Sequence, residues 1–123
     1  AARAALEECL TAEGYARVDL LGIRLAEGLE AIFARRGLDW CAPLIGGRCG
    51  WVLGPEFPRN TEESAATMDI FFSNTRRVFM ANRGIWEALD TAGPACSCAH
   101  SEADVDLYLE VSEEFVALTT TPS

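Results

Sequence analysis

The sequence contains no lysine, because each of its ten basic residues is an arginine. A lysine amine is the side chain that forms Schiff bases with carbonyl cofactors or substrates, so no such linkage can form on this chain. The sequence also lacks an apolar run near the roughly 20 residues that cross a bilayer. Its opening text, AARAALEECL, has no initiator methionine and no signal-peptide pattern. We therefore expect a cytoplasmic protein and a chain cut from a longer one.

Positive charge is scarce: ten basic residues face nineteen acidic ones, for a net charge of -9. Phosphate backbones and anionic lipids are held by clustered cations, so we expect neither a nucleic-acid nor a membrane partner. A chain of 123 residues is long enough to fold as one domain with its own core.

Five cysteines are an odd number, and no secretory leader accompanies them. This combination favours unpaired, buried thiols in a reducing compartment over a disulfide framework. The cysteines are Cys9, Cys41, Cys49, Cys96 and Cys98.

Two of these thiols and the single histidine recur at every second position, as Cys96, Cys98 and His100. Zinc sites usually need four ligands, and an extended strand sends alternate side chains out in a row along one face. We therefore interpret the segment as a strand whose cysteines face the core, with His100 in a fixed hydrogen bond at its end. A Cys/His metal-binding module remains the less favoured alternative.

Apolar residues three and four apart predict a helix over Tyr15–Arg36, with Gly37 as its left-handed cap. A helix over Ala1–Glu13 precedes it, with an interruption near Gly14. Near the other end, Ser101 to Asp104 forms a capping box that begins a last helix with one apolar stripe.

The middle of the chain mixes strand and helix signals. Gly46–Gly47 predicts a turn that leads into a strand, and Gly84 closes a helix. The predicted segments are a strand through Leu53, a loop over Gly54–Thr61, a strand over Met68–Phe72, a helix over Thr75–Arg83, an extended Ile85–Ala88 and a strand over Ala95–His100. Together they predict an α+β two-layer sandwich, with a small, mostly antiparallel sheet and helices mainly on one face.

Four pieces in order carry a family resemblance: LGIRLAEGLEAIFARRGL, a glycine step before a hydrophobic strand, a helix ending in RGI, and SCAHSEADVD. They resemble the C-terminal small domain of class III (fold type I) aminotransferases, with glutamate-1-semialdehyde aminomutases as the nearest group. The resemblance implies that residues 1–118 form this small domain and that 119–123 are a loose tail.

The same resemblance implies a cofactor and partners outside this chain. Such enzymes bind pyridoxal 5'-phosphate (PLP) through a lysine of an upstream large domain and are usually homodimers. This chain then closes one side of a substrate cleft and is not catalytic alone, which agrees with its lack of lysine. Either an aminotransferase or an aminomutase, acting on an amino or keto compound, fits the resemblance. A stand-alone interaction domain is the alternative.

The departures from the family pattern define the candidate site. Arg48 stands where the family has an apolar side chain, and the family's glutamate near the substrate has only Glu87 or Asp90 as shifted counterparts. A guanidinium can hold a carboxylate bidentately, so Arg48 is the first candidate for substrate contact, with Gly47, Glu87 and Asp90 beside it. The alternative for Arg48 is a surface ion pair. We expect Trp86 in the core or at an interface.

Overall fold

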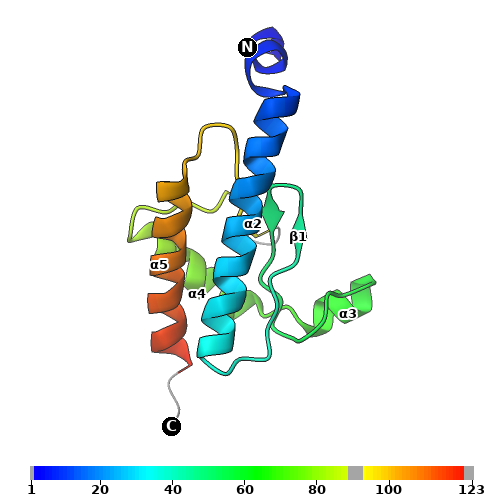
Figure 1. The fold of residues 1–123 in the computed structure, drawn as a ribbon. Helices are drawn as coiled ribbons and strands as arrows, with labels where there is room; N and C mark the ends of the chain where they lie inside the picture. The colour runs from blue at the N-terminus through cyan, green and yellow to red at the C-terminus, as the bar shows by residue number, and fades with distance from the viewer. Residues whose placement is uncertain (1, 89–92, 121–123) are drawn as a thin grey trace.

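The computed structural model describes residues 2–88 and 93–120 (Figure 1). These form a helix-rich α+β fold with one two-stranded antiparallel sheet, in agreement with the predicted class. The elements are α1 (Ala2–Ala4), the π-helical η1 (Ala5–Cys9), α2 (Ala12–Arg35), β1 (Leu44–Ile45), β2 (Arg48–Cys49), α3 (Thr61–Ala66), α4 (Ile70–Ala81) and α5 (Glu102–Thr119).

The core lies where α2 and α5 run side by side (Figure 1). Leu25 and Leu29 on α2 and Phe115 on α5 are almost completely buried. Each such side chain contributes roughly 1.5–3 kcal/mol when it leaves water. The two helices approach closely at Gly28, where any Cβ would collide with the side chain of Leu109.

Aromatic rings extend this core toward α4 and the segment that follows α2. Phe33 meets Trp40 and Trp51 edge to face, at centroid distances of 5.5 and 5.2 Å. Phe72 on α4 lies 5.2 Å from Phe115 on α5. Each such aromatic pair contributes about 0.5–1.5 kcal/mol of stability beyond that from the burial of apolar surface. They fix α4 and the chain around Trp51 against the α2–α5 pair.

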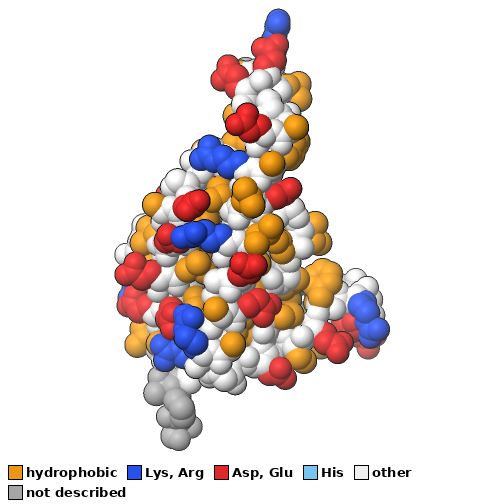
Figure 2. Space-filling view, in the orientation of Figure 1, with side chains coloured by type: hydrophobic (Ala, Val, Ile, Leu, Met, Phe, Trp, Pro, Cys, Tyr) orange, Lys and Arg blue, Asp and Glu red, His pale blue; other side chains and the backbone are white. Residues whose placement is uncertain are grey.

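The first helix break lies at Leu10–Thr11, earlier than predicted. Thr11 caps α2 by accepting a hydrogen bond from the Gly14 N–H at 3.1 Å. Gly14 permits the close approach of the chain at this break, because a Cβ there would overlap the carbonyl oxygen of Cys9. Ahead of the break, η1 has no buried residue and projects from the body of the molecule (Figures 1 and 2).

The predicted strand over Met68–Phe72 is wrong. The Asp69 carboxylate caps α4 by accepting from the Phe72 N–H at 2.9 Å, so the helix begins at Ile70 instead of Thr75. A capping carboxylate satisfies an otherwise unpaired helix N–H, which outweighs the strand preference of the apolar run. The short helix α3 was also not predicted, and its cap is the side chain of Asn60.

The sheet is smaller than predicted. In the hairpin, Ile45 pairs with Arg48 across the Gly46–Gly47 turn, and Arg48 also forms an isolated bridge to Ala95. Beyond β2 the expected strand is reduced to one bridge at Val52, and Ile85–Ala88 joins no ladder.

The predicted strand over Ala95–His100 is also wrong beyond its first residue. The chain turns because His100 Nδ1 accepts the Ser97 N–H at 2.9 Å, which confirms the expected fixed hydrogen bond of this histidine. The capping box of Ser101 and Asp104 is confirmed. Helix α5 then reaches Thr119, one residue past the expected domain boundary, and the tail residues 121–123 lie outside the described part.

No helix within residues 2–88 and 93–120 has the length and apolar character that a membrane span requires.

Candidate functional site

An open pocket of about 410 Å³ lies between β2, the segment after α4, the segment before α5, and α5 itself. Its lining includes two predicted site residues, Arg48 and Glu87, which are far apart in the sequence. Gly47 precedes Arg48 in the hairpin turn but does not line the pocket, and Asp90 lies outside the described residues. The structure therefore brings together the guanidinium and one of the two acids that were predicted.

The hairpin turn places Arg48 at the pocket. Gly46 has φ +57°, a left-handed conformation that glycine adopts without strain, and Gly47 packs so closely on Val18 that a Cβ would overlap it. A close approach of this kind fixes the backbone while the next side chain remains exposed. Arg48 is thus an exposed residue on a well-anchored strand.

Arg48 differs from the other arginines in its partners. The side chain of each of the other nine forms an ion pair or a hydrogen bond with a carboxylate or a backbone carbonyl, whereas the Arg48 guanidinium has neither with any residue in the described ranges. In a chain with a net charge of -9, an arginine without an acidic partner is available to an external anion. The alternative prediction, that Arg48 forms a surface ion pair, is not observed among the described residues.

An exposed aromatic ring belongs to the same pocket. Trp86 is 71% exposed, and its ring lies 4.8 Å from the guanidinium carbon of Arg77. Arg77 also donates through Nε to the carbonyl oxygen of Glu87 at 3.0 Å. Stacking and hydrogen bonding by one arginine therefore fix the segment that carries the tryptophan. Trp86 is therefore not in the core. Of the two predicted locations, only an interface with another protein surface remains.

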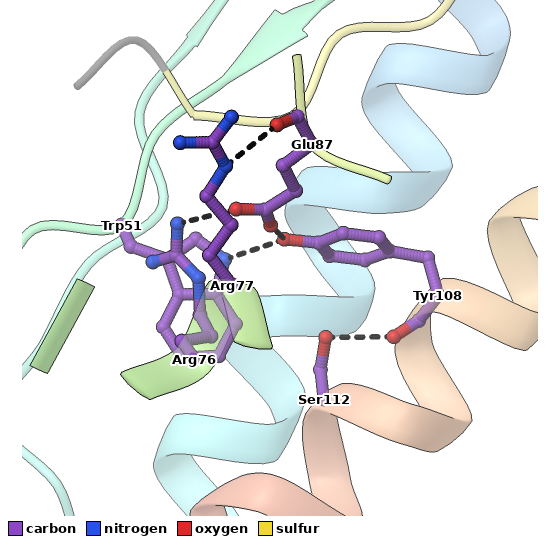
Figure 3. A network of polar contacts seen from close by, with 6 residues as sticks. All are labelled: Trp51, Arg76, Arg77, Glu87, Tyr108 and Ser112. Carbon is purple, nitrogen blue, oxygen red and sulfur yellow. Dashed lines mark hydrogen bonds and ion pairs between the residues drawn. The ribbon is translucent and has the colours of Figure 1, made fainter. Parts of the chain in front are cut away.

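Glu87, next to Trp86, is buried in a polar network (Figure 3). Its Oε2 accepts from Arg76 Nη2 at 2.9 Å, and its Oε1 accepts from the Tyr108 hydroxyl at 2.5 Å. Tyr108 in turn accepts from Trp51 Nε1 at 3.1 Å. Both carboxylate oxygens are thus engaged, and three elements meet at one side chain.

Burial makes this network electrostatically strong. The side chains of Arg76 and Glu87 are only 3% and 2% exposed, so solvent screens their attraction little. Arg76 also stacks on Trp51 at 4.6 Å, and its Nε has no hydrogen-bond partner among the described residues. Burial and the nearby Glu87 carboxylate raise the pKa of Tyr108 well above its usual range. Tyr108 therefore stays a neutral hydrogen-bond donor at ordinary pH.

Sequence reasoning missed Arg76 and the role of Tyr108. Tyr108 falls in the apolar stripe of the last helix, so its burial could be predicted, but nothing in the stripe identifies the partner of its hydroxyl. Arg76 gives no local signal, because an arginine within a helix is usually solvated. A buried arginine becomes visible only when Glu87 is brought against it in three dimensions.

The residues of the metal alternative do not form a ligand set. Within the described ranges, no group of three or more His, Cys, Asp and Glu side chains could hold a metal ion. His100 uses Nδ1 within its own turn, and the Cys98 thiol points at the Cys9 carbonyl oxygen, 3.3 Å away. Cys96 packs partly against the core.

No known family model matches this sequence. Among solved structures, the chain is similar to a glutamate-1-semialdehyde aminomutase from Pseudomonas aeruginosa PAO1, with a TM-score of 0.87 and 22% sequence identity. A variant of that enzyme in complex with PMP gives the same values. The similarity covers 94% of this chain and 25% of the neighbour in both cases. The chain therefore has the fold of about a quarter of a glutamate-1-semialdehyde aminomutase, which is the small-domain fold that the sequence predicted.

Proposed function

We propose that this chain is the C-terminal small domain of a PLP-dependent aminotransferase or aminomutase that acts on an amino or keto compound. The observation that carries the proposal is the fold: 94% of the chain superimposes, at a TM-score of 0.87, on a quarter of an enzyme of that kind. The order of the sequence motifs supports the same assignment independently.

The residues of this chain do not suit it to hold PLP by itself. The cofactor would need a lysine for its covalent attachment, and the sequence has none. We therefore assign PLP to the upstream large domain of the parent protein. The part left to this chain is to bind and orient substrate and to exclude water when the cleft closes.

Arg48 is the residue that we propose for substrate contact. It lines the 410 Å³ pocket, is exposed, and has no acidic partner in the described part of the chain. Its planar guanidinium suits a substrate carboxylate. Gly47 anchors its strand. Glu87 remains a candidate acid of the same pocket, although both its oxygens are engaged by Arg76 and Tyr108, and Asp90, outside the described residues, remains a prediction. The Arg76–Glu87–Tyr108 network would hold the Trp86 segment at a fixed distance from Arg48.

Exposed apolar side chains support a large packing partner. On and before α4, Met68, Ile70, Phe71 and Val78 are exposed, and the Phe71 side chain is 82% exposed. Apolar surface of this extent usually lies against another protein surface. We propose that the partner is the upstream large domain, within a cytoplasmic homodimer. A stand-alone interaction domain would need an unrelated partner at the same surface.

The cofactor assignment is tested by absorbance spectroscopy on two proteins: the product of the complete gene and this 123-residue chain. After incubation with PLP and desalting, we expect the visible PLP band in the complete product and none in the chain. A complete product that binds no PLP would remove the proposal in favour of an interaction domain.

The role of Arg48 is tested by kinetics of the complete product. In Arg48→Ala, we expect KM for the carboxylate-bearing substrate to rise roughly tenfold or more, because a charge-assisted hydrogen bond contributes about 1.5–3 kcal/mol. Arg48→Lys should recover part of the loss. Arg59→Ala, which removes an arginine paired with Glu63 on the surface, is the matched control and should leave KM unchanged. An unchanged KM in Arg48→Ala would exclude the contact.

A further inference from the structure

Two cysteines that are 89 positions apart in the sequence lie against each other. Cys9 ends η1, and Cys98 lies in the turn that follows Ala95. The Cys98 Sγ is 3.3 Å from the carbonyl oxygen of Cys9. Both are free thiols in the structure. We propose that Cys9 and Cys98 are a redox modification site, which forms a reversible intramolecular disulfide and fastens η1 to the 97–100 turn.

The other three cysteines are poorly placed for the same reaction. Cys49 is completely buried, and burial raises its pKa to about 12, so almost none of it is thiolate at neutral pH. Burial also raises the pKa of Cys41 and Cys96. Cys9, by contrast, is exposed, and Cys98 is the half-buried thiol next to it. Accessibility therefore selects this pair.

The surroundings allow the bond to close. The observed contact places the Cys98 sulfur beside the Cys9 backbone. A disulfide needs its Cα atoms about 4.4–6.8 Å apart, so the Cys9 side chain and η1 must adjust to close the bond. None of the η1 residues is buried, so η1 can shift slightly without loss of core packing. The turn is held from the other side, because Arg17 Nη2 donates to the His100 carbonyl oxygen at 2.8 Å. Cys9 can thus move with η1, whereas Cys98 is held in its turn.

The reaction requires a low-molecular-weight disulfide as the oxidant, for which oxidised glutathione is the probe. The exposed Cys9 thiolate attacks one glutathione sulfur, forms a mixed disulfide and releases one glutathione thiol. The Cys98 thiolate then attacks the Cys9 sulfur and releases the second. Each cysteine gives up one proton, two cysteines are oxidised, and one glutathione disulfide is reduced to two thiols.

Formation of the Cys9–Cys98 disulfide would also affect the 410 Å³ pocket. Cys96 and His100, on either side of Cys98, both line it. A bond from Cys98 to η1 would therefore restrain the pocket wall that these two residues form. This inference does not depend on the proposed function, because it concerns thiols of this chain alone.

The test treats the full chain with oxidised glutathione and counts its thiols after denaturation. The count should fall from five to three, since one bridge consumes two of the five thiols, and dithiothreitol should restore all five. No arginine follows Arg83, so one tryptic fragment carries both Cys96 and Cys98. Single serine variants therefore identify the bridge: Cys9→Ser and Cys98→Ser should form none, and Cys96→Ser should form it as the original chain does.

Three results would overturn the proposal. They are a bridge that persists in Cys98→Ser, a stable glutathione adduct on Cys9 without a second step, and a disulfide-linked dimer through Cys9. A thiol count that stays at five with excess oxidised glutathione would overturn it as well. Because Cys9 is exposed, Cys9→Ser leaves the core intact, and its far-UV circular dichroism serves as the check on folding.

Discussion

Two ion pairs of the same chemical type occupy opposite environments in this molecule. Arg76 and Glu87 meet at 2.9 Å with side chains that are 3% and 2% exposed. Arg35 and Glu113 join α2 to α5 at the surface with side chains that are 54% and 36% exposed. Figure 2 shows similar arginine and acidic side chains interspersed over the face of α2 and α5. Geometry alone does not distinguish the two pairs, but solvent does.

The difference shows where the structure of the site is determined. The surface pairs are screened by water and ions, so losing one changes little. The buried pair has no such substitute, and it joins α4, α5 and the segment that carries Trp86 (Figure 3). We therefore expect the position of that segment to depend on this buried carboxylate, in addition to the contacts of Arg77. The following predictions test this contrast.

The largest effect is expected for Glu87→Ala. Removing the carboxylate leaves the Arg76 charge buried and unpaired, which costs about 3–5 kcal/mol of unfolding free energy. Urea unfolding followed by circular dichroism measures it. Glu87→Gln keeps hydrogen-bonding groups and should lose less. A loss below about 1 kcal/mol in Glu87→Ala would mean that the pair is solvated and the contrast is wrong.

An intermediate effect is expected for Tyr108→Phe. The ring keeps its packing, but Glu87 Oε1 and Trp51 Nε1 each lose their partner, at a cost of about 1–3 kcal/mol. Urea unfolding again gives the value, and Trp51 fluorescence should change in the native state. A neutral outcome would indicate that water replaces the hydroxyl without cost.

A small effect is expected for Arg35→Gln. The pair with Glu113 is exposed, so the loss should be roughly 0.2–1 kcal/mol. At about 1 M salt, where the screening length is near 3 Å, the difference from the original chain should nearly vanish. Urea unfolding at low and high salt measures this loss of unfolding free energy. A loss as large as that of Glu87→Ala would contradict the proposed difference between the exposed and the buried ion pair.

The smallest effect concerns acid pH. Hydrogen bonds from the Ser101 N–H and hydroxyl lower the pKa of Asp104, and the hydrogen bond from Arg24 lowers that of Asp106. A lowered folded-state pKa stabilises the fold above the unfolded value near 3.9, and this stability is lost as pH falls through the folded-state pKa. The urea midpoint should therefore decline below about pH 4. The slope should be shallower in Asp104→Asn, and an identical slope would contradict this assignment.

Features that depend on local chemistry could be predicted from the sequence. The capping box of Ser101 and Asp104 needs only residues three apart, and it begins α5 as expected. Gly37 and Gly84 follow their helices with φ of +67° and +81°, a left-handed conformation that strains residues with a Cβ and that glycine adopts freely. The departures from the family pattern indicate Arg48 and Glu87, and both line the pocket, while their role toward substrate stays a prediction.

Features that depend on distant contacts could not be predicted. The apolar run after Met68 has strand character, yet the Asp69 cap and packing of Phe72 against Phe115 make it helical. The strand predicted through His100 fails because Ser97 and His100 close a turn. The burial of Arg76 depends on a glutamate eleven positions away that returns from a loop.

The most direct test of the central claim is a complementation measurement on the proposed parent enzyme. The large domain that we propose upstream of Ala1 is purified alone, and amino-group transfer is measured with and without this chain added. We predict that the upstream part binds PLP but turns over slowly, and that the added chain restores turnover while Arg48→Ala restores less. Equal turnover without the chain would contradict the account.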